Sequence, residues 1–241
     1  MTTTAPIILS NAVNQITAAS APILILDTCS VLDLIRLPRR AKDATYAQAE
    51  LAAVKNLKDS AQARKLWIVV PPIVYDEWSD NYQTEVRELS KFLSKLDNSV
   101  AITNKIDDFL SSKSTIMGQY AYLNLEAKLK SFSEEIFSGA IFLEEDIDCK
   151  DKALSRAVSN TPPASRGGGI KDCIIIEHAI KLCNDMRTLG HKESVVFNTS
   201  NTRDYCEIGT GNVKEPLKAQ FQGIKLTLTT SWQWTKTELG I

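Results

Sequence analysis

Four short runs of apolar residues stand out along the chain and predict the buried strands of a sheet. They are Ile23–Leu26, Trp67–Val70, Val195–Phe197 and Ile224–Leu228. The first three are continuous rather than alternating, as expected for strands whose two faces are both covered. These runs therefore favour a parallel arrangement.

Helical patterns lie between these runs. Residues 44–63 are rich in good helix formers such as Ala, Leu, Gln, Lys and Glu. Residues 73–96 carry apolar side chains every three or four positions, which is typical of an amphipathic helix, with Pro71 or Pro72 suited to its first turn. A third helix is predicted over 174–189. Strands separated by helices indicate an α/β fold with a mainly parallel sheet and right-handed crossovers.

Between about residues 79 and 165 the alternation of strands and helices is interrupted. This stretch holds only moderately periodic helix candidates and loops, and it ends in an irregular connection over 160–169. We therefore expect a helical insertion over 79–165 within a single domain that spans 1–241. A chain of 241 residues can bury a sizeable core without disulfides or structural metals.

Composition excludes several classes of protein. With 44% hydrophobic and 24% charged residues, the chain is typical of a globular protein rather than a disordered or fibrous one. No stretch reaches the roughly 18 apolar residues of a membrane-spanning helix, and the N-terminus lacks the pattern of a signal peptide. Five scattered cysteines and only two histidines argue against structural zinc, and they favour reduced thiols in a cytoplasmic protein.

Charge is unevenly distributed, although the formal net charge is only −1. Residues 36–65 include eight basic and three acidic side chains, whereas residues 134–151 include seven acids and one lysine. Each segment can be a solvated helix face, or the basic one can follow a phosphate backbone. Because no bulk positive field attracts nucleic acid, any such contact must come from local patches or bound cations.

Four carboxylates lie where the predicted strands end or where the next helix begins. Asp27 directly follows the first run, Glu77 comes one short turn after the second, and Asp204 follows the third. Asp172 lies at the start of the helix predicted after the glycine run 167–169. Ligands of an open parallel sheet bind outside the carboxyl ends of its strands, so these acids can converge. Crowded carboxylates repel one another unless a hard divalent cation such as Mg²⁺ or Mn²⁺ joins them, and such a site can promote phosphodiester hydrolysis.

Each of these acids also has a purely structural interpretation. In chain order these are the end of a strand, a solvated helix surface, a helix cap and a local turn. Only their shared placement makes the set informative. Two neighbouring acids are left out: residues 30–33 match a capping box, which accounts for Asp33, and Asp76 points to a different helix face from Glu77.

The glycine run 167–169 is flanked by two basic residues, Arg166 and Lys171. Glycine lets backbone N–H groups approach a phosphate closely, and the two cations can steady its non-bridging oxygens. The spacing is neither that of a Walker A loop nor that of a Rossmann fingerprint. A flexible connection into the following helix is the alternative.

Four segments carry motifs in a recognisable order. They are 25–32 (Ile-Leu-Asp-Thr-Cys-Ser-Val-Leu), 71–77, 167–173 and 197–205. Together they resemble the motifs of PIN-domain nucleases, and the long middle insertion resembles in particular the larger bacterial PIN-like proteins. One departure is Cys29, where these openings more often have Asn or Ser. We expect Cys29 to support the first turn without abolishing metal binding.

The resemblance implies a three-layer α/β/α sandwich and metal-dependent cleavage of single-stranded or structured RNA. It also implies one or two Mg²⁺ or Mn²⁺ ions held by an acidic cluster. The acids of that cluster are Asp27, Glu77, Asp172 and Asp204. Ser200 and Asn201 match the polar positions that order such a cluster or its water. Homodimers are common among proteins of this type, and a protein inhibitor is a further partner to consider.

The leading hypothesis is therefore a PIN-like endoribonuclease. The first ion would be held by Asp27, Glu77 and Asp172, and Asp204 would complete the site or help to bind a second ion. A competing hypothesis is a PIN-like module that binds RNA or a protein without cutting, which the near-neutral charge, Cys29 and the acidic insertion favour. A third is a metal-dependent phosphatase acting on small phosphoesters.

Overall fold

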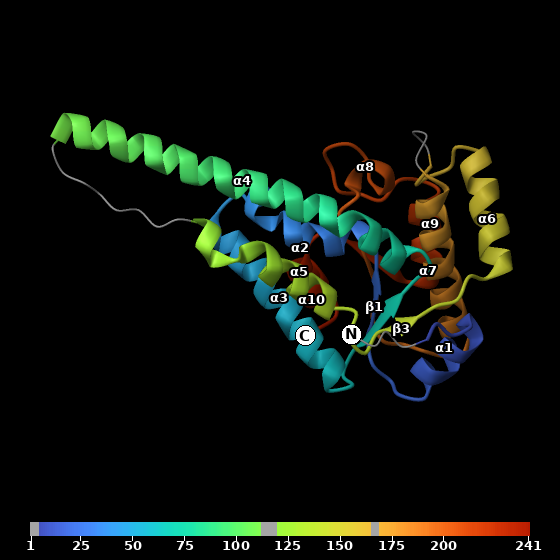
Figure 1. Ribbon diagram of the computed structural model, residues 1–241. Coiled ribbons are helices and arrows are strands. Elements are labelled where there is room, and N and C mark those ends of the chain that lie inside the picture. Colours follow the sequence, from blue (N-terminus) through green and yellow to red (C-terminus); the bar gives the residue numbers. More distant parts are fainter. Residues whose placement is uncertain (1–4, 112–119, 165–168) are drawn as a thin grey trace.

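A parallel sheet forms the centre of the protein, with helices on both of its faces (Figure 1). The computed structural model describes residues 5–111, 120–164 and 169–241. The strands are β1 (Ile23–Leu26), β2 (Trp67–Val70), β3 (Ile141–Phe142), β4 (Val195–Asn198) and β5 (Leu226–Thr229). Their order in the sheet is β3-β2-β1-β4-β5. Strands are added on one side of β1 up to β3 and on the other side afterwards, so the order reverses between β1 and β4.

Three of the four predicted strands coincide with β1, β2 and β4, and they are parallel as their continuous apolar runs indicate. The fourth begins at Leu226 rather than at Ile224. Helix α9 (Leu217–Ile224) extends through Ile224, and Lys225 ends it with a left-handed backbone at φ 54°. The polar alternation of this run reflects its position at the edge of the sheet.

Strand β3 lies within the stretch that was expected to hold only helices and loops. Its residues pair in parallel with Val69 and Val70 of β2. The expectation over 79–165 was therefore wrong on this point, because β3 lies in a short apolar run at 140–143 that was not taken as a strand. The boundaries of the insertion remain a prediction.

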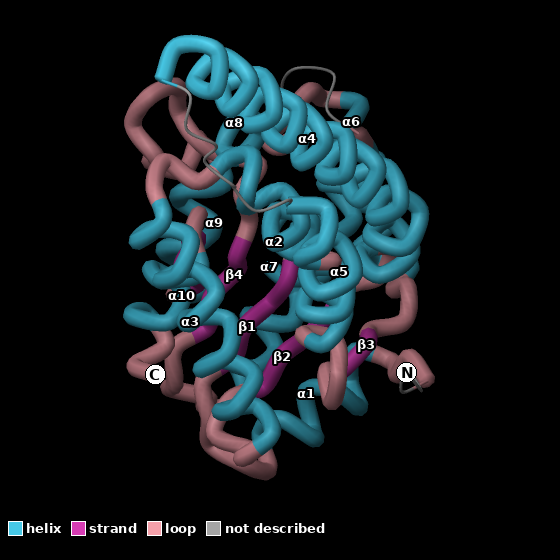
Figure 2. Tube along the Cα trace, turned by 60° about the vertical axis from the view of Figure 1, so that its left-hand side comes forward, coloured by secondary structure: helices cyan, strands magenta, loops and turns pink. Residues whose placement is uncertain are grey.

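The helices form two layers, one on each face of the sheet, as Figure 2 shows from a second direction. One layer contains α2 (Thr28–Arg40), α3 (Ala44–Gln62), α4 (Val74–Ser111), α5 (Leu125–Glu135) and α10 (Trp232–Glu238). The other contains α1 (Leu9–Thr17), α6 (Ile147–Val158), α7 (Ile170–Thr188) and α9. Two short helical segments, η1 (Tyr120–Leu123) and α8 (Thr202–Tyr205), complete the described elements. The predicted three-layer α/β/α sandwich is thus confirmed.

The sheet is the most buried part of the core. All four residues of β1 have no exposed surface, because helices cover both sides of this central strand. Full burial of one aliphatic side chain contributes about 1.5–3 kcal/mol to folding, so β1 is held firmly between the layers. The position of Asp27, the residue after β1, is fixed by this anchoring.

Helix α4 starts in the core and then leaves it. Its first turns pack Trp78 against Tyr75 and Tyr82, with ring centroids 5.8 and 5.0 Å apart. The helix begins at Val74 and continues well past the predicted end at residue 96. Its far end projects from the body of the protein (Figure 1), where Phe109 is 88% exposed.

Ion pairs join α2 to α4. Glu85 of α4 accepts hydrogen bonds from Arg36 and Arg39 of α2 at 2.8 and 2.5 Å. Arg36 and Arg40 also pair with Asp33 at 3.0 and 2.6 Å. Part of the basic charge predicted over 36–65 is therefore used within the protein. We refer to these five side chains as the α2–α4 clasp.

Within the described ranges, no helix is both long enough and apolar enough to cross a membrane. The five cysteines are all unpaired, and four of them are buried.

Candidate active site

Asp27 lies at the carboxyl end of β1, at the point where the strand order reverses. Its N–H donates to the carbonyl oxygen of Asn198 at 3.1 Å, which continues the pairing of β1 with β4. Asp27 precedes α2 as its N-cap residue, but its side chain does not cap the helix. Instead, Oδ2 accepts a hydrogen bond of 2.6 Å from the Thr199 hydroxyl. The carboxylate is thus turned away from its own helix and toward β4.

The carboxyl group of Asp27 is buried, with 1% of the residue exposed. Burial raises its pKa to about 7, against the opposing effect of the Thr199 hydrogen bond. The nearby charges of Asp172 and Glu77 raise this pKa further. Two of the predicted partners therefore lie close enough to act on Asp27 electrostatically.

Glu77 comes from the first turn of α4, which follows β2 after a short bend. Ile73 makes that bend with a left-handed backbone at φ 78°, and its carbonyl accepts the Glu77 N–H at 2.8 Å. Pro71 and Pro72 precede the helix rather than lying in its first turn. The adjacent acid, Asp76, is exposed and is not among the charges that shift the pKa of Asp27.

Asp172 comes from the first turn of α7 on the opposite layer. The N-cap residue is Gly169, which has no side chain to cap the helix, so Asp172 does not act as the N-cap. Burial raises the pKa of Asp172 to about 6, and the charges of Asp204 and Glu77 raise it as well. The Asn201 amide lies 3.5 Å from Asp172 Oδ1 and has a smaller, lowering effect on that pKa.

Asp204 lies on α8, directly after the loop that follows β4. Its Oδ2 accepts a hydrogen bond of 3.0 Å from the Asn201 Nδ2, the same amide that approaches Asp172. The Tyr205 hydroxyl donates to the Asp172 carbonyl oxygen at 3.2 Å and ties α8 to α7. Lys214 Nζ donates to the Asp204 carbonyl oxygen at 3.1 Å, which holds the short helix from its other side.

The structure brings these four acids from four elements to one edge of the sheet. The charges of Glu77 and Asp172 raise the pKa of Asp27, and those of Glu77 and Asp204 raise the pKa of Asp172, so the four carboxylates are neighbours. In the part of the chain that the structure describes, however, no three His, Cys, Asp or Glu side chains stand ready to hold a metal ion. The four acids are neighbours, but they do not form a closed coordination shell in the described residues.

The remaining predicted residues differ in their placement. Asn201 bridges two of the acids, whereas Ser200 lines a separate cavity beside them. Lys171 is half exposed, with Nζ 3.9 Å from Glu77 Oε1. Arg166 and most of the glycine run 167–169 lie outside the described residues.

Two details of the first motif differ from expectation or extend it. Ser30 lies inside α2, which begins at Thr28, so residues 30–33 do not form a capping box. Asp33 nevertheless stays outside the acidic group because it pairs with arginines of the α2–α4 clasp. Burial raises the pKa of the Cys29 thiol, as do Asp27 and Asp172, so this thiol is neutral beside the acids.

Thr199 was not predicted, although it connects most of the group. Its hydroxyl donates to Asp27 and accepts the N–H of Asn201 at 3.0 Å. The strand register places Thr199 beside Asp27. Leu26 of β1 pairs with Asn198 of β4, so the residues that follow them, Asp27 and Thr199, are neighbours. That register cannot be read from one sequence.

A family model described as a PIN domain matches residues 24–205, which is more than half of the chain. The chain belongs to the PIN-domain family. PIN domains are generally nucleases and typically use divalent metal ions. The matched range contains each of the four gathered acids. A search of curated proteins and a search of solved structures found no match.

Proposed function

We propose that this PIN domain is a metal-dependent endoribonuclease that hydrolyses RNA phosphodiester bonds. The observation that carries the proposal is the gathering of four acids, from the ends of β1 and β4 and the starts of α4 and α7, where the strand order reverses. That position is the usual ligand site of an open parallel sheet. Its location fits a substrate that reaches the sheet from outside.

The donor set fits Mg²⁺ or Mn²⁺, because carboxylate oxygens are the ligands that these hard cations prefer. Mutual repulsion and burial raise the pKa of Asp27 and Asp172, and a cation between them would reverse both effects. Asp27, Glu77 and Asp172 would hold one ion, and Asp204 would complete the site or help to hold a second. When bound, such an ion polarises the phosphodiester and lowers the pKa of a water molecule.

The chain's own residues position these ligands. Thr199 fixes Asp27 through its short hydrogen bond, and the Asn201 amide keeps Asp172 and Asp204 at a set separation. Lys171, and Arg166 by its place in the sequence, would approach the non-bridging oxygens of the phosphate. With a net charge of −1, these local cations and the metal would have to supply the attraction for RNA.

The proposal extends to partners and to the place of action. Single-stranded or structured RNA is the proposed substrate, in the cytoplasm, where unpaired cysteines such as these five remain reduced. A homodimer and a protein inhibitor remain proposals that rest on the family alone.

The test is Mn²⁺-dependent cleavage of a labelled single-stranded RNA by Asp27→Asn, with Asp76→Asn as the matched control. Asp76→Asn removes an exposed acid one residue from Glu77 and should keep wild-type activity. Asp27→Asn should lose at least about 100-fold, because even outer-shell changes at metal sites cost 10–100-fold. Equal cleavage by Asp27→Asn and the wild type would reject the proposal.

The second candidate is a PIN domain that binds RNA or a protein without cutting it. The observation that favours it is that no three metal-ligating side chains among the described residues stand ready to hold an ion. Calorimetric titration with Mn²⁺ separates the two candidates. The nuclease requires a binding isotherm that Asp27→Asn weakens, whereas a binding module requires none.

A further inference from the structure

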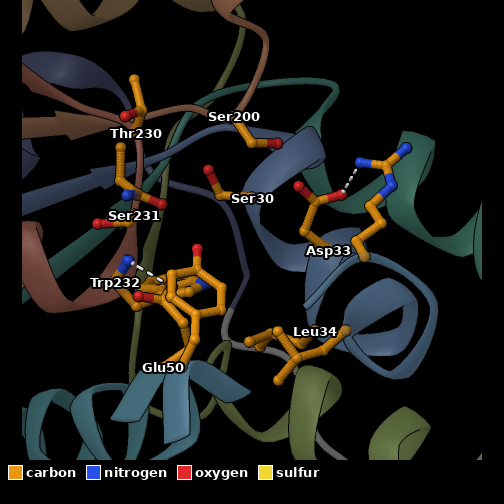
Figure 3. A pocket seen from close by; sticks show the side chains of 12 residues that line it. Ser30, Asp33, Leu34, Glu50, Ser200, Thr230, Ser231 and Trp232 are labelled. Atoms are coloured by element: carbon orange, nitrogen blue, oxygen red, sulfur yellow. Dashed lines mark hydrogen bonds and ion pairs between the residues drawn. The ribbon is translucent and has the colours of Figure 1, made fainter. Parts of the chain in front are cut away.

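A small cavity near the acidic group contains none of its four acids, and Figure 3 shows the side chains that line this cavity. Its volume is about 80 Å³, and side chains of α2, α3, α10 and the loops after β4 and β5 line it. By this measure one water molecule needs roughly 10–15 Å³, so the cavity has room for several waters or for one planar ring. The inference below rests on the proposed function.

Successive residues of the loop after β4 contact the acids and the cavity in turn. Thr199 and Asn201 contact the carboxylates, whereas Ser200 between them lines the cavity. On the facing helix, Ser30 lines the same cavity three positions after Asp27. A group in the cavity would therefore lie within one nucleotide's reach of a phosphate at the acids.

Asn198 carries the most informative atom of the lining. The residue is 1% exposed, and its Oδ1 is buried without a hydrogen-bond partner among the described residues. Buried acceptors are almost always satisfied, so this atom calls for a donor. Asn198 is one of the residues that line the cavity, so a donor bound there would approach its amide.

The hydrogen bonds around Asn198 establish which end of its amide is free. The Thr235 hydroxyl has one proton, which it donates to the Ser231 carbonyl oxygen at 2.8 Å. It must therefore accept at its 2.7 Å contact with Asn198, so that contact comes from Nδ2. The unpartnered atom is consequently the oxygen, an acceptor.

The rest of the lining supplies further acceptors and flat apolar surface. Asp33 uses Oδ1 for its two arginines, which leaves Oδ2 without a partner among the described residues. Tyr46 and Trp232 contribute aromatic rings. The lining also holds the hydroxyls of Ser30, Ser200 and Thr230, which make no hydrogen bond within the described ranges and appear at one side of Figure 3.

Charge decides between a phosphate and a neutral ring as the occupant. The lining contains two carboxylates, Asp33 and Glu50, and one cation, Arg40, so its net charge disfavours an anion. Glu50 is already occupied, since its Oε2 accepts the Trp232 N–H at 2.8 Å. The free acceptors and the aromatic rings suit a flat, neutral group that brings its own N–H donors.

We propose that this cavity binds the base of the nucleotide adjoining the scissile phosphate, and that it favours bases with an exocyclic amino group. The two N–H bonds of the amino group of adenine, cytosine or guanine would donate to Asn198 Oδ1 and Asp33 Oδ2. Uracil offers a single ring N–H, so it could satisfy only one of these two acceptors. The cavity thereby gives the nuclease a preference at one position of its substrate.

The experiment is a saturation-transfer NMR titration of the whole protein with free adenosine, cytidine, guanosine, uridine and ribose. Thr230→Phe fills the cavity from a half-buried position, and Thr188→Phe makes the same change on an exposed turn of α7. The amino-bearing nucleosides should bind about two- to tenfold more tightly than uridine, the effect of one neutral hydrogen bond. Thr230→Phe should abolish this binding, and Thr188→Phe should retain it.

Each other outcome overturns the inference. The inference is wrong if uridine binds as tightly as the amino-bearing nucleosides or if ribose alone binds. It is also wrong if Thr230→Phe leaves binding unchanged or if no nucleoside binds. If Thr230→Phe fails to show a wild-type unfolding transition, Ser200→Val, at another lining residue, takes its place. Cleavage of RNA is measured separately. Nucleoside binding without cleavage would reject the nuclease alone, and cleavage without nucleoside binding would reject the cavity alone.

Discussion

Helix α2 connects two regions that use charge in opposite ways. At its start, Asp27 lies among other carboxylates, and burial together with like charges raises its pKa to about 7. In its second half, Arg36 and Arg39 pair with Glu85 of α4. Burial alone would raise the pKa of Glu85, but these two arginines lower it. One region has its counterions inside the chain, and the other lacks them.

This difference distinguishes charged side chains that stabilise the fold from charged side chains that could bind a ligand. The α2–α4 clasp is complete without any outside partner, so its role is to hold two helices of one layer together. The acidic group is costly unless something positive joins it, because neighbouring carboxylates cannot all ionise cheaply. Because the ionised acidic group is energetically unfavourable without a counterion, a cation and a phosphate substrate are expected to bind there.

The largest effect is predicted for the clasp. Glu85→Ala leaves the partly buried Arg39 without an ion pair and Arg36 with Asp33 alone, and it should lower the free energy of unfolding by about 2 kcal/mol, below the cost of breaking a fully buried pair. The measurement is chemical denaturation. Glu88→Ala, which removes an exposed acid on the same helix, is the control and should not move the midpoint. Equal midpoints for both variants would show that the clasp is not structural.

A smaller effect is predicted for the residue that positions Asp27. Thr199→Val removes the hydrogen bond that lowers the pKa of Asp27, so protons should compete better with the metal. Affinity for Mn²⁺ at pH 7 should fall about tenfold, the lower end of the range for outer-shell changes. The pH profile of cleavage should also move to higher pH.

Thr199→Ser keeps the hydroxyl and is the matched variant for this test. It should restore both the Mn²⁺ affinity and the pH profile. A Thr199→Val protein that loses stability but keeps its pH profile would limit Thr199 to a structural role.

The smallest effect concerns stability without metal. Because the folded-state pKa of Asp27 is raised, the folded protein binds more protons than the unfolded chain between about pH 4 and pH 7. The contribution of Asp27 to stability therefore falls as the pH rises through this window. In EDTA at pH 8, Asp27→Asn should melt at least about 2 °C above the wild type, the shift that about 1 kcal/mol produces in a chain of this size.

The same pair of proteins should converge at low pH. Well below pH 4 the wild-type carboxyl is protonated in both the folded and unfolded states, so the advantage of Asp27→Asn should vanish. An Asp27→Asn protein that is less stable than the wild type at pH 8 in EDTA would contradict this account of the acidic group.

The central fold could be predicted because its signals are local. The apolar runs of β1, β2 and β4 are continuous, and the helices between them follow the 3.6-residue period. Strand β3 lies in the apolar run 140–143, which was missed, and its pairing with β2 depends on contacts distant in sequence. The far end of α4 does carry apolar side chains at helical spacing, Ile102, Ile106 and Phe109, but the prediction ended at residue 96 without using them.

The candidate site was predictable only in part, for the same reason. The acids mark strand ends, which a sequence reveals, and their meeting at one edge follows from a parallel sheet. The residues that orient them depend on register and on loop shape. Thr199 acts because β1 and β4 are in register, and the cavity beside it joins α2 to α10, two helices far apart in the chain.

The most direct test of the account is a crystal of this protein soaked in Mn²⁺ and examined for anomalous scattering. The account predicts a peak in contact with oxygens of Asp27 and Asp172, with Glu77 or Asp204 turned toward it, and no such peak in Asp27→Asn. A soaked crystal whose manganese lies elsewhere, with these carboxylates left unbound, would contradict the claim that the acids form a cation site.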